Sequence, residues 1–113
     1  KVWQACLAEM DAASLAGHFH NTYGMAIANI YQSLEQGIRV FDSSIAGLGG
    51  CPYAKGASGN VSTEDLYYLL SNMGYDTGID LDALMIASQN ISQVLQRTNP
   101  SNYANAYWQK RCA

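Results

Sequence analysis

The stretches Leu15-Ala-Gly-His-Phe-His20 and Ile38-Arg-Val-Phe-Asp-Ser-Ser-Ile45 decide the fold of this chain. The first indicates a short strand, and the second, compact and β-branched, is typical of a buried strand. Between them, from Tyr23 to Gln36, apolar residues recur at steps of three and four, which predicts an amphipathic helix ending at Gly37. Its predicted apolar face consists of Tyr23, Ile27, Ile30, Tyr31 and Leu34. Strand, helix and strand in this order predict a parallel βαβ unit and the α/β class.

Two histidines, His18 and His20, end the first predicted strand. Strand side chains alternate between two faces, so both imidazoles should point to the same face. The end of a strand just before a helix is where α/β folds place their ligand sites. The pair therefore indicates a metal site, with two ordinary polar residues at a sheet end as the alternative.

A glycine-rich loop from Ala46 to Gly59 follows the second strand and carries Cys51. Loops of this length in compact domains are usually functional or disordered. An exposed thiol near a cation can act as nucleophile or proton donor, whereas the alternative is a chance loop cysteine. The loop glycines would let the backbone approach a ligand closely; they are Gly47, Gly49, Gly50, Gly56 and Gly59.

Asn60, directly after this loop, could add a carbonyl oxygen to the two imidazoles. Two nitrogens and an oxygen, without thiolate, suit octahedral Mn²⁺, Mg²⁺ or a Co²⁺-like ion better than structural zinc. The nearby carboxylates Asp42 and Glu64 are more typical of a strand end and a helix cap than of catalysts.

The remaining segments predict helices and a tail. Val2 to Met10 has helical spacing, and a capping box at residues 62–65 precedes a helix from Leu66 to Met73. Asp80 should cap a longer helix with one buried face, formed by Leu81, Leu84, Met85, Ser88, Ile91, Val94 and Leu95. Residues 98–113 indicate a poorly specified tail with a helical turn near Tyr107 and Trp108.

The composition argues against nucleic-acid binding, membrane association and a disulfide-stabilised fold. The chain has 113 residues and a net charge of −3, which gives no electrostatic case for binding nucleic acid or an anionic membrane surface. No apolar run approaches the ~20 residues of a membrane span. Cys6, Cys51 and Cys112 form an odd set without CxxC spacing, so a reducing compartment is expected rather than a disulfide framework. Cys6 is expected to be a small core residue.

Two quoted motifs resemble a known family. The stretch Gly17-His-Phe-His-Asn-Thr-Tyr-Gly24 and, above all, Ser44-Ile-Ala-Gly-Leu-Gly-Gly-Cys-Pro-Tyr53 resemble the C-terminal part of the 3-hydroxy-3-methylglutaryl-CoA lyase family. The similarity runs from about Leu15 to about Ile91. The second motif is highly specific, whereas the His-x-His element is shared with other metal-dependent barrel aldolases, lyases and synthases.

The resemblance implies part of a (β/α)₈ TIM barrel over residues 1–97, about two βα units plus terminal helices, followed by the tail. It implies that His18, His20 and Asn60 bind Mg²⁺ or Mn²⁺ and that Cys51 serves in proton transfer. The implied reaction is metal-dependent cleavage of a CoA-thioester substrate to acetyl-CoA and acetoacetate, as in ketogenesis and leucine degradation. The implied location is the bacterial cytoplasm or, in a eukaryote, the mitochondrial matrix.

Two departures from the family pattern shape the expectations. Asn21 stands where the family usually has Asp, which should loosen support for His20. No stretch matches the family's Arg-Asp-Glu-type motif, and a whole barrel needs ~250 residues. We therefore expect an inactive segment that associates with itself or with the missing N-terminal barrel half. The alternatives are another metal-dependent barrel aldolase or acyl-transferring synthase, and a non-catalytic oligomerising chain.

Overall fold

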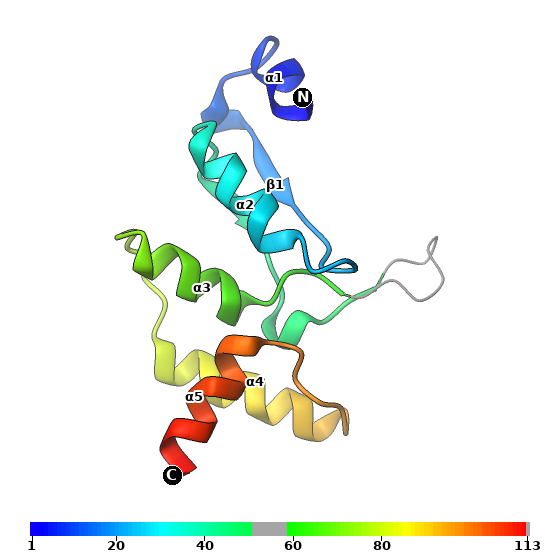
Figure 1. Cartoon of the computed structure of the whole chain (residues 1–113), viewed down its shortest axis with the longest axis vertical. Helices are drawn as coiled ribbons and strands as arrows, with labels where there is room; N and C mark the ends of the chain where they lie inside the picture. Colours follow the sequence, from blue (N-terminus) through cyan, green and yellow to red (C-terminus); the bar gives the residue numbers. More distant parts are fainter. Residues whose placement is uncertain (51–58, 113) are drawn as a thin grey trace.

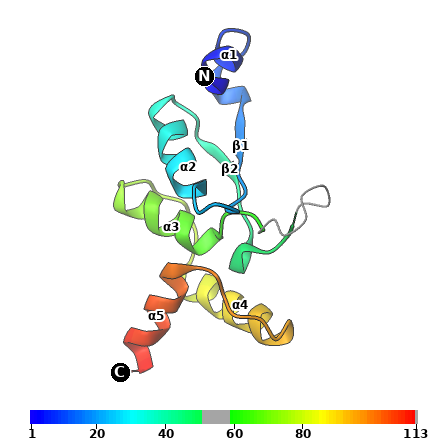
Figure 2. The same ribbon diagram turned by 45° about the vertical axis from the view of Figure 1, so that its right-hand side comes forward.

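The structure, a computed structural model, describes residues 1–50 and 59–112. Its centre is a two-stranded parallel sheet of β1 (Ala16–His18) and β2 (Val40–Asp42), joined through helix α2 (Ala26–Glu35). Figure 1 shows β1 and α2, and Figure 2 shows both strands. The predicted βαβ unit is therefore confirmed. The register pairs Ala16 with Val40 and His18 with Asp42, which places the histidine and the aspartate side by side on neighbouring strands.

Helix α2 forms because apolar residues recur on one side of it. Its buried residues are Ala26, Ile30, Ser33 and Leu34, and they form a core with Val61 and Leu66. Gly37 follows with a φ of +89°, the left-handed C-terminal geometry that was predicted. The predicted apolar face was wrong at Tyr23 and Tyr31, which are 90% and 49% exposed. Tyr23 lies before the start of the helix. The buried face of the helix includes Ala26 and Ser33 in place of the two tyrosines.

Both strands are shorter than expected. The strand predicted from Ile38 to Ile45 is regular only at Val40–Asp42, and Val40 is 53% exposed. The expectation of a strand buried on both faces was therefore wrong. Only two strands pair in the described part of the chain, so too little structure covers the sheet to bury it.

The N-terminal helix α1 (Val2–Leu7) is also shorter than predicted and buries none of its residues. It is attached through Trp3, whose indole Nε1 donates to Ser33 Oγ at 2.6 Å and whose ring meets Phe19 edge-on. A short 3₁₀ turn, η1 (Ala12–Ser14), leads from it into β1. Cys6 is half-buried rather than a core residue.

The two helix caps predicted in the second half are confirmed. Ser62 Oγ accepts from the Asp65 backbone N–H at the start of α3 (Thr63–Asn72), at 3.2 Å. Asp80 Oδ1 accepts from the Ala83 N–H at the start of α4 (Leu81–Val94), at 2.9 Å. The predicted face of α4 holds in its first half, with Leu84, Met85 and Ser88 buried, and fails at Val94 and Leu95, which are 75% and 49% exposed.

The tail expected after residue 97 is largely a helix. Helix α5 runs from Asn102 to Cys112, so the predicted turn near Tyr107 and Trp108 is part of a much longer element. Asp65 Oδ1 accepts from Ser101 Oγ at 2.8 Å and from the Tyr103 N–H at 2.9 Å, and Ala104 is buried. Ser101 Oγ also accepts from the Ala104 N–H at 3.0 Å, so a local serine cap begins the helix and Asp65 of α3 adds to it. The sequence did not reveal this helix because its residues are mostly polar and show no apolar periodicity.

The elements form two groups, visible in Figures 1 and 2. The sheet and α2 lie toward the N-terminal end, and α4 and α5 lie together at the other end, with α3 between them. A 3₁₀ turn, η2 (Ile45–Gly47), lies between the sheet and α4 and contacts both α3 and α4. In the part of the chain that the structure describes, no helix is long and apolar enough to cross a membrane.

Candidate functional site

The two histidines meet at the end of β1. Their ring centroids are 5.3 Å apart, so both imidazoles lie on one side of the strand, as expected. Beyond β1 the chain stays extended and pairs with residues 59–61. Val61 N–H donates to the Phe19 carbonyl at 3.0 Å, Asn21 N–H donates to the Gly59 carbonyl at 3.1 Å, and His20 pairs with Asn60. Three predicted ligand residues are thus brought together by main-chain pairing.

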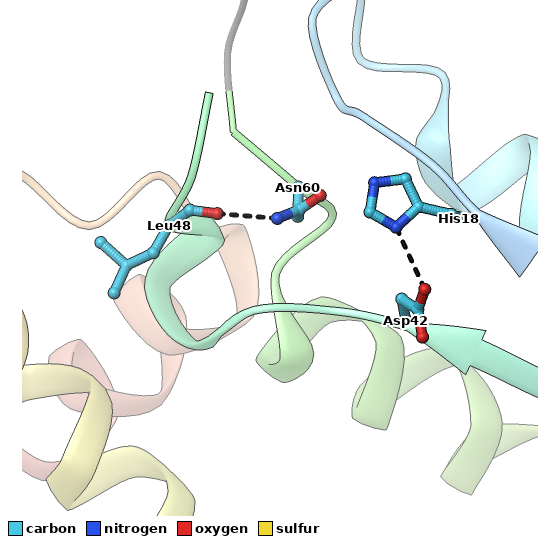
Figure 3. A network of polar contacts seen from close by, with 4 residues as sticks. All are labelled: His18, Asp42, Leu48 and Asn60. Carbon is cyan, nitrogen blue, oxygen red and sulfur yellow. Dashed lines mark hydrogen bonds and ion pairs between the residues drawn. The ribbon is translucent and has the colours of Figure 1, made fainter. Parts of the chain in front are cut away.

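Asn60 is held with its amide group in a defined orientation. Its Nδ2 donates to the Leu48 carbonyl at 3.1 Å, and this contact fixes which end of the carboxamide faces the loop (Figure 3). Its Oδ1 is buried and has no hydrogen-bond partner among the described residues. A buried acceptor left unsatisfied costs about 1–3 kcal/mol, so such an atom requires an explanation. A bound cation would supply one.

Glycines allow the two ends of the loop to meet. A Cβ on Gly59 would lie 1.9 Å from the Gly47 carbonyl oxygen, and one on Gly49 would lie 2.8 Å from Asn60 Nδ2. Gly49 also has a φ of +101°, which side chains rarely tolerate. These glycines were expected to let the backbone approach a ligand. In the described residues they let the backbone approach itself and Asn60.

Asp42, interpreted from the sequence as a strand-end residue, does end β2, and it makes a contact with His18 that sequence reasoning missed. His18 Nδ1 and Asp42 Oδ2 are 3.1 Å apart, and Figure 3 shows the imidazole turned toward the carboxylate. The parallel register accounts for the contact, because His18 and Asp42 are direct cross-strand partners. Both residues lie within the two predicted strands, Leu15–His20 and Ile38–Ile45, but the register that pairs them could not be read from the sequence.

Asn21, which replaces the family's usual Asp, has a structural contact of its own. Its Oδ1 accepts from the Ala26 backbone N–H at 3.2 Å, which satisfies one of the free amides at the start of α2. A neutral amide therefore serves here at a helix N-terminus. The Asp42 carboxylate is an acidic group that contacts His18.

Glu64, predicted to be a helix-cap residue, lies in the first turn of α3, but its side chain is buried and contacts the turn at Ala46. It is 0% exposed, and its two oxygens lie 3.0 and 3.1 Å from the Ala46 backbone N–H. Ser88 Oγ donates to the same carboxylate, and Arg97 NH2 donates to the Ala46 carbonyl at 3.0 Å. Ala46 has a φ of +52°, so this network stabilises a strained turn where the loop begins.

A hollow of about 370 Å³ adjoins the site between the loop ends and the C-terminal helices. Asn60, Asp65 and Arg97 contribute to its wall, together with Gly49 and Gly59. Its wall therefore carries the amide of Asn60, the carboxylate of Asp65 and the guanidinium of Arg97. A polar ligand could enter there beside the Asn60 side chain.

The donor set fits a divalent metal. In the part of the chain that the structure describes, no three His, Cys, Asp or Glu side chains gather. The Asn60 amide, on the segment paired with His20, is the candidate for a third donor beside the two imidazoles. Imidazole nitrogen and carboxamide oxygen are donors that Mn²⁺ and related ions accept. Cys51, the predicted catalytic thiol, lies outside the described residues.

The comparisons with known proteins agree with these motifs. A profile of the family described as HMGL-like matches residues 2–91. The chain belongs to the HMGL-like family. This family has a TIM-barrel fold, of which the chain contains a small α/β part with a two-stranded parallel sheet.

Members of the family with known activity are closely similar to this chain. A hydroxymethylglutaryl-CoA lyase from Pseudomonas mevalonii is 55% identical over 101 residues, covering 89% of the chain and 34% of that protein. The human mitochondrial lyase is 51% identical over 102 residues, covering 90% and 31%. The chain therefore spans about a third of the length of the curated relatives it matches.

Solved lyases of the family superpose well on the structure. The hydroxymethylglutaryl-CoA lyase of Pseudomonas aeruginosa gives a TM-score of 0.89 at 56% identity, covering 95% of this chain and 36% of that one. A lyase of Acinetobacter baumannii, solved with coenzyme A and 3-methylmalate, gives 0.86 at 42% identity, covering 93% and 34%. The HMGL-like resemblance predicted from the motifs is confirmed.

Proposed function

We propose that this chain is part of a hydroxymethylglutaryl-CoA lyase that cleaves 3-hydroxy-3-methylglutaryl-CoA to acetyl-CoA and acetoacetate. His18, His20 and Asn60 would hold a divalent metal, Mg²⁺ or Mn²⁺. The cellular location that goes with this activity is the bacterial cytoplasm or the mitochondrial matrix. High identity to lyases supports the reaction, although the chain spans only about a third of them.

The orientation of Asn60 is the observation that carries the metal proposal. Its Nδ2 is bound to the Leu48 carbonyl, and its buried Oδ1 lacks a partner among the described residues. The backbone pairing of Asn60 with His20 places this oxygen on the segment next to two imidazoles. A hard oxygen donor beside two nitrogens is a ligand set for a divalent cation.

Each group has a chemical task in this proposal. A divalent cation at this site would acidify the tertiary hydroxyl of the substrate, a general base would take the hydroxyl proton, and the C–C bond would break to leave the acetyl-CoA enolate. The imidazoles and the amide would fix the position of that hydroxyl relative to the protein. Cys51, on the loop between Gly50 and Pro52, would hand a proton to the carbon released as acetyl-CoA.

Metal binding by the chain itself tests the ligand set. Isothermal titration with Mn²⁺ should show one weak site, because a carboxylate ligand from the rest of the barrel would be missing. Asn60→Ala and His20→Ala should abolish it, while Asn90→Ala, an exposed amide on α4, should leave it unchanged. Binding that survives both ligand variants would refute this assignment.

The reaction can be tested in a chimeric enzyme. This chain would replace the matching 101-residue segment of the Pseudomonas mevalonii lyase, to which it is 55% identical. We expect lyase activity from the chimera and none from the chain alone. In the chimera, Cys51→Ser should lower kcat while leaving Mn²⁺ affinity unchanged, whereas Cys6→Ser should alter neither. An equal loss of metal affinity would make Cys51 a ligand or a structural residue.

A non-catalytic, oligomerising chain is the second candidate. The sheet has only two paired strands in the described part of the chain, and Val40 and Tyr31 are large, exposed side chains on its βαβ unit. Self-association or pairing with an N-terminal barrel half would cover them. Failure of the chimera to cleave the thioester, with Mn²⁺ binding absent, would favour this candidate.

A further inference from the structure

We propose that Asp42 is a positioning residue for His18. Its carboxylate holds the neutral imidazole in the tautomer that carries the proton on Nδ1, which leaves Nε2 as the nitrogen that binds a cation. The link to a cation rests on the proposed function, whereas the effect on the tautomer does not.

The contact follows from the strand register. His18 and Asp42 are cross-strand partners in the parallel sheet, and His18 Nδ1 lies 3.1 Å from Asp42 Oδ2. A carboxylate is only an acceptor, so the hydrogen between these atoms must come from the imidazole. In a neutral ring with Nδ1–H, the lone pair lies on Nε2.

The same contact would orient the ring. Histidines that bind metals usually donate their other N–H to a carboxylate or carbonyl, and loss of that partner typically weakens metal binding 10–100-fold. Among the described residues, Asp42 is the carboxylate paired with His18. The neighbouring Asn21 amide contacts the start of α2 instead.

The pair is too exposed to matter much for folding. The side chains of His18 and Asp42 are 54% and 65% exposed, and exposed ion pairs contribute little to stability. Variants of Asp42 should therefore fold like the native chain. A change in the tautomer or in metal affinity can then be assigned to the lost contact.

The tautomer can be measured directly by NMR of ¹⁵N-labelled histidine in the complete chain, at a pH near 8.5 where ordinary imidazole is neutral. We expect His18 to carry its proton on Nδ1 in the native chain and mainly on Nε2 in Asp42→Leu. Asp42→Asn keeps an acceptor and should give an intermediate result. Asp11→Leu removes another exposed carboxylate and should change nothing. An unchanged tautomer in Asp42→Leu would overturn the inference.

A second measurement separates this inference from the proposed function. The Kd for Mn²⁺ should rise about 10–100-fold in Asp42→Leu, less in Asp42→Asn, and not at all in Asp11→Leu. A shifted tautomer with an unaltered Kd would overturn the positioning role while leaving the metal site intact. A native chain that holds the Nδ1–H tautomer but does not bind Mn²⁺ would overturn the metal site, with Asp42 still setting the imidazole proton.

Discussion

At the scale of single residues, the absence of a side chain at Gly17 allows the two strands that carry His18 and Asp42 to pair. Gly17 lies between two aromatic rings, and a Cβ there would lie 2.7 Å from Phe19 Cε2 and 2.8 Å from Phe41 Cδ1. Its neighbour His18 depends on the pairing of these strands. The glycine is therefore part of what keeps β1 and β2 in register.

We expect Gly17→Ala to lower the free energy of unfolding by about 1–3 kcal/mol, the usual cost of overpacking. Urea unfolding followed by circular dichroism would measure it. Gly50→Ala is the matched control, because among the described residues a Cβ there meets no atom within 4 Å, and Gly50 has no positive φ. Equal stability of the two variants would show that the rings move aside freely.

Glu64 shows what the sequence could not reveal about single residues. It was predicted to be a helix-cap residue because it follows Ser62 and Thr63. The structure instead buries it completely, with partners 18 and 24 residues away at Ala46 and Ser88. Contacts that distant in sequence carry no periodic signal.

Glu64→Gln should destabilise the chain by about 1–3 kcal/mol, because an amide replaces one acceptor oxygen by a donor in a buried network. Differential scanning calorimetry would detect the lower Tm. The exposed Glu35→Gln on α2 should leave Tm unchanged. A native Tm for Glu64→Gln would mean that one oxygen satisfies the Ala46 amide.

At the scale of elements, local signals were reliable and long-range ones were not. Ser62, Gly37 and Asp80 marked helix ends correctly because caps act over a few residues. Helix α5 was missed because its sequence is mostly polar, although Ser101 supplies a local cap to the Ala104 N–H that was not recognised. Asp65 of α3 adds a contact to the Tyr103 N–H that the sequence could not reveal. The shared face of His18 and His20 was predictable from strand alternation, and the contact with Asp42 was not.

We expect Asp65→Ala to loosen α5 selectively. The change removes the acceptor for Ser101 Oγ and the Tyr103 N–H, a loss of about 0.5–2 kcal/mol for a helix cap. Hydrogen exchange should then quicken in residues 102–112 more than in α2. Asp76→Ala, on the loop after α3, provides the control. Uniformly faster exchange would indicate global unfolding instead.

The pairing of α4 with α5 should depend on pH at both extremes. The hydrogen bond from Tyr107, followed by the charge of Arg111, lowers the pKa of Asp82 below 3.8, and the same hydrogen bond raises the pKa of Tyr107 above 10.0. The carboxylate contribution is present above the ordinary Asp pKa and is lost as pH falls through the lowered value. The phenol contribution is present below pH 10 and is lost as pH rises through the raised value.

The difference in fluorescence between the native chain and Tyr107→Phe reports on Tyr107. This difference should stay constant across neutral pH and change only in strong acid or strong base. Tyr107→Phe should remove both transitions from this helix pair, because the phenol is the shared group. A transition near neutral pH would contradict the direction of both pKa shifts.

At the scale of the whole molecule, the chain forms the predicted unit but leaves much of it uncovered. Two paired strands in the described part of the chain leave each with a free edge, and exposed apolar side chains include Val40, Tyr31 and Met25. The chain spans about a third of the length of the relatives it matches, and its structure shows two strands without the other strands of a barrel around them. This mismatch explains why the strand predicted to be buried is half-exposed.

We therefore expect the isolated chain to self-associate, since free strand edges and apolar surface both favour pairing between copies. Light scattering should show an average mass that increases with protein concentration. Val40→Lys places a charge on the exposed β2 strand and should shift the mass toward that of the monomer. Val94→Lys, at a 75% exposed position on α4, should leave the mass unchanged. A monomer at every concentration would contradict the argument, because the free edges would then be stable in water without a partner.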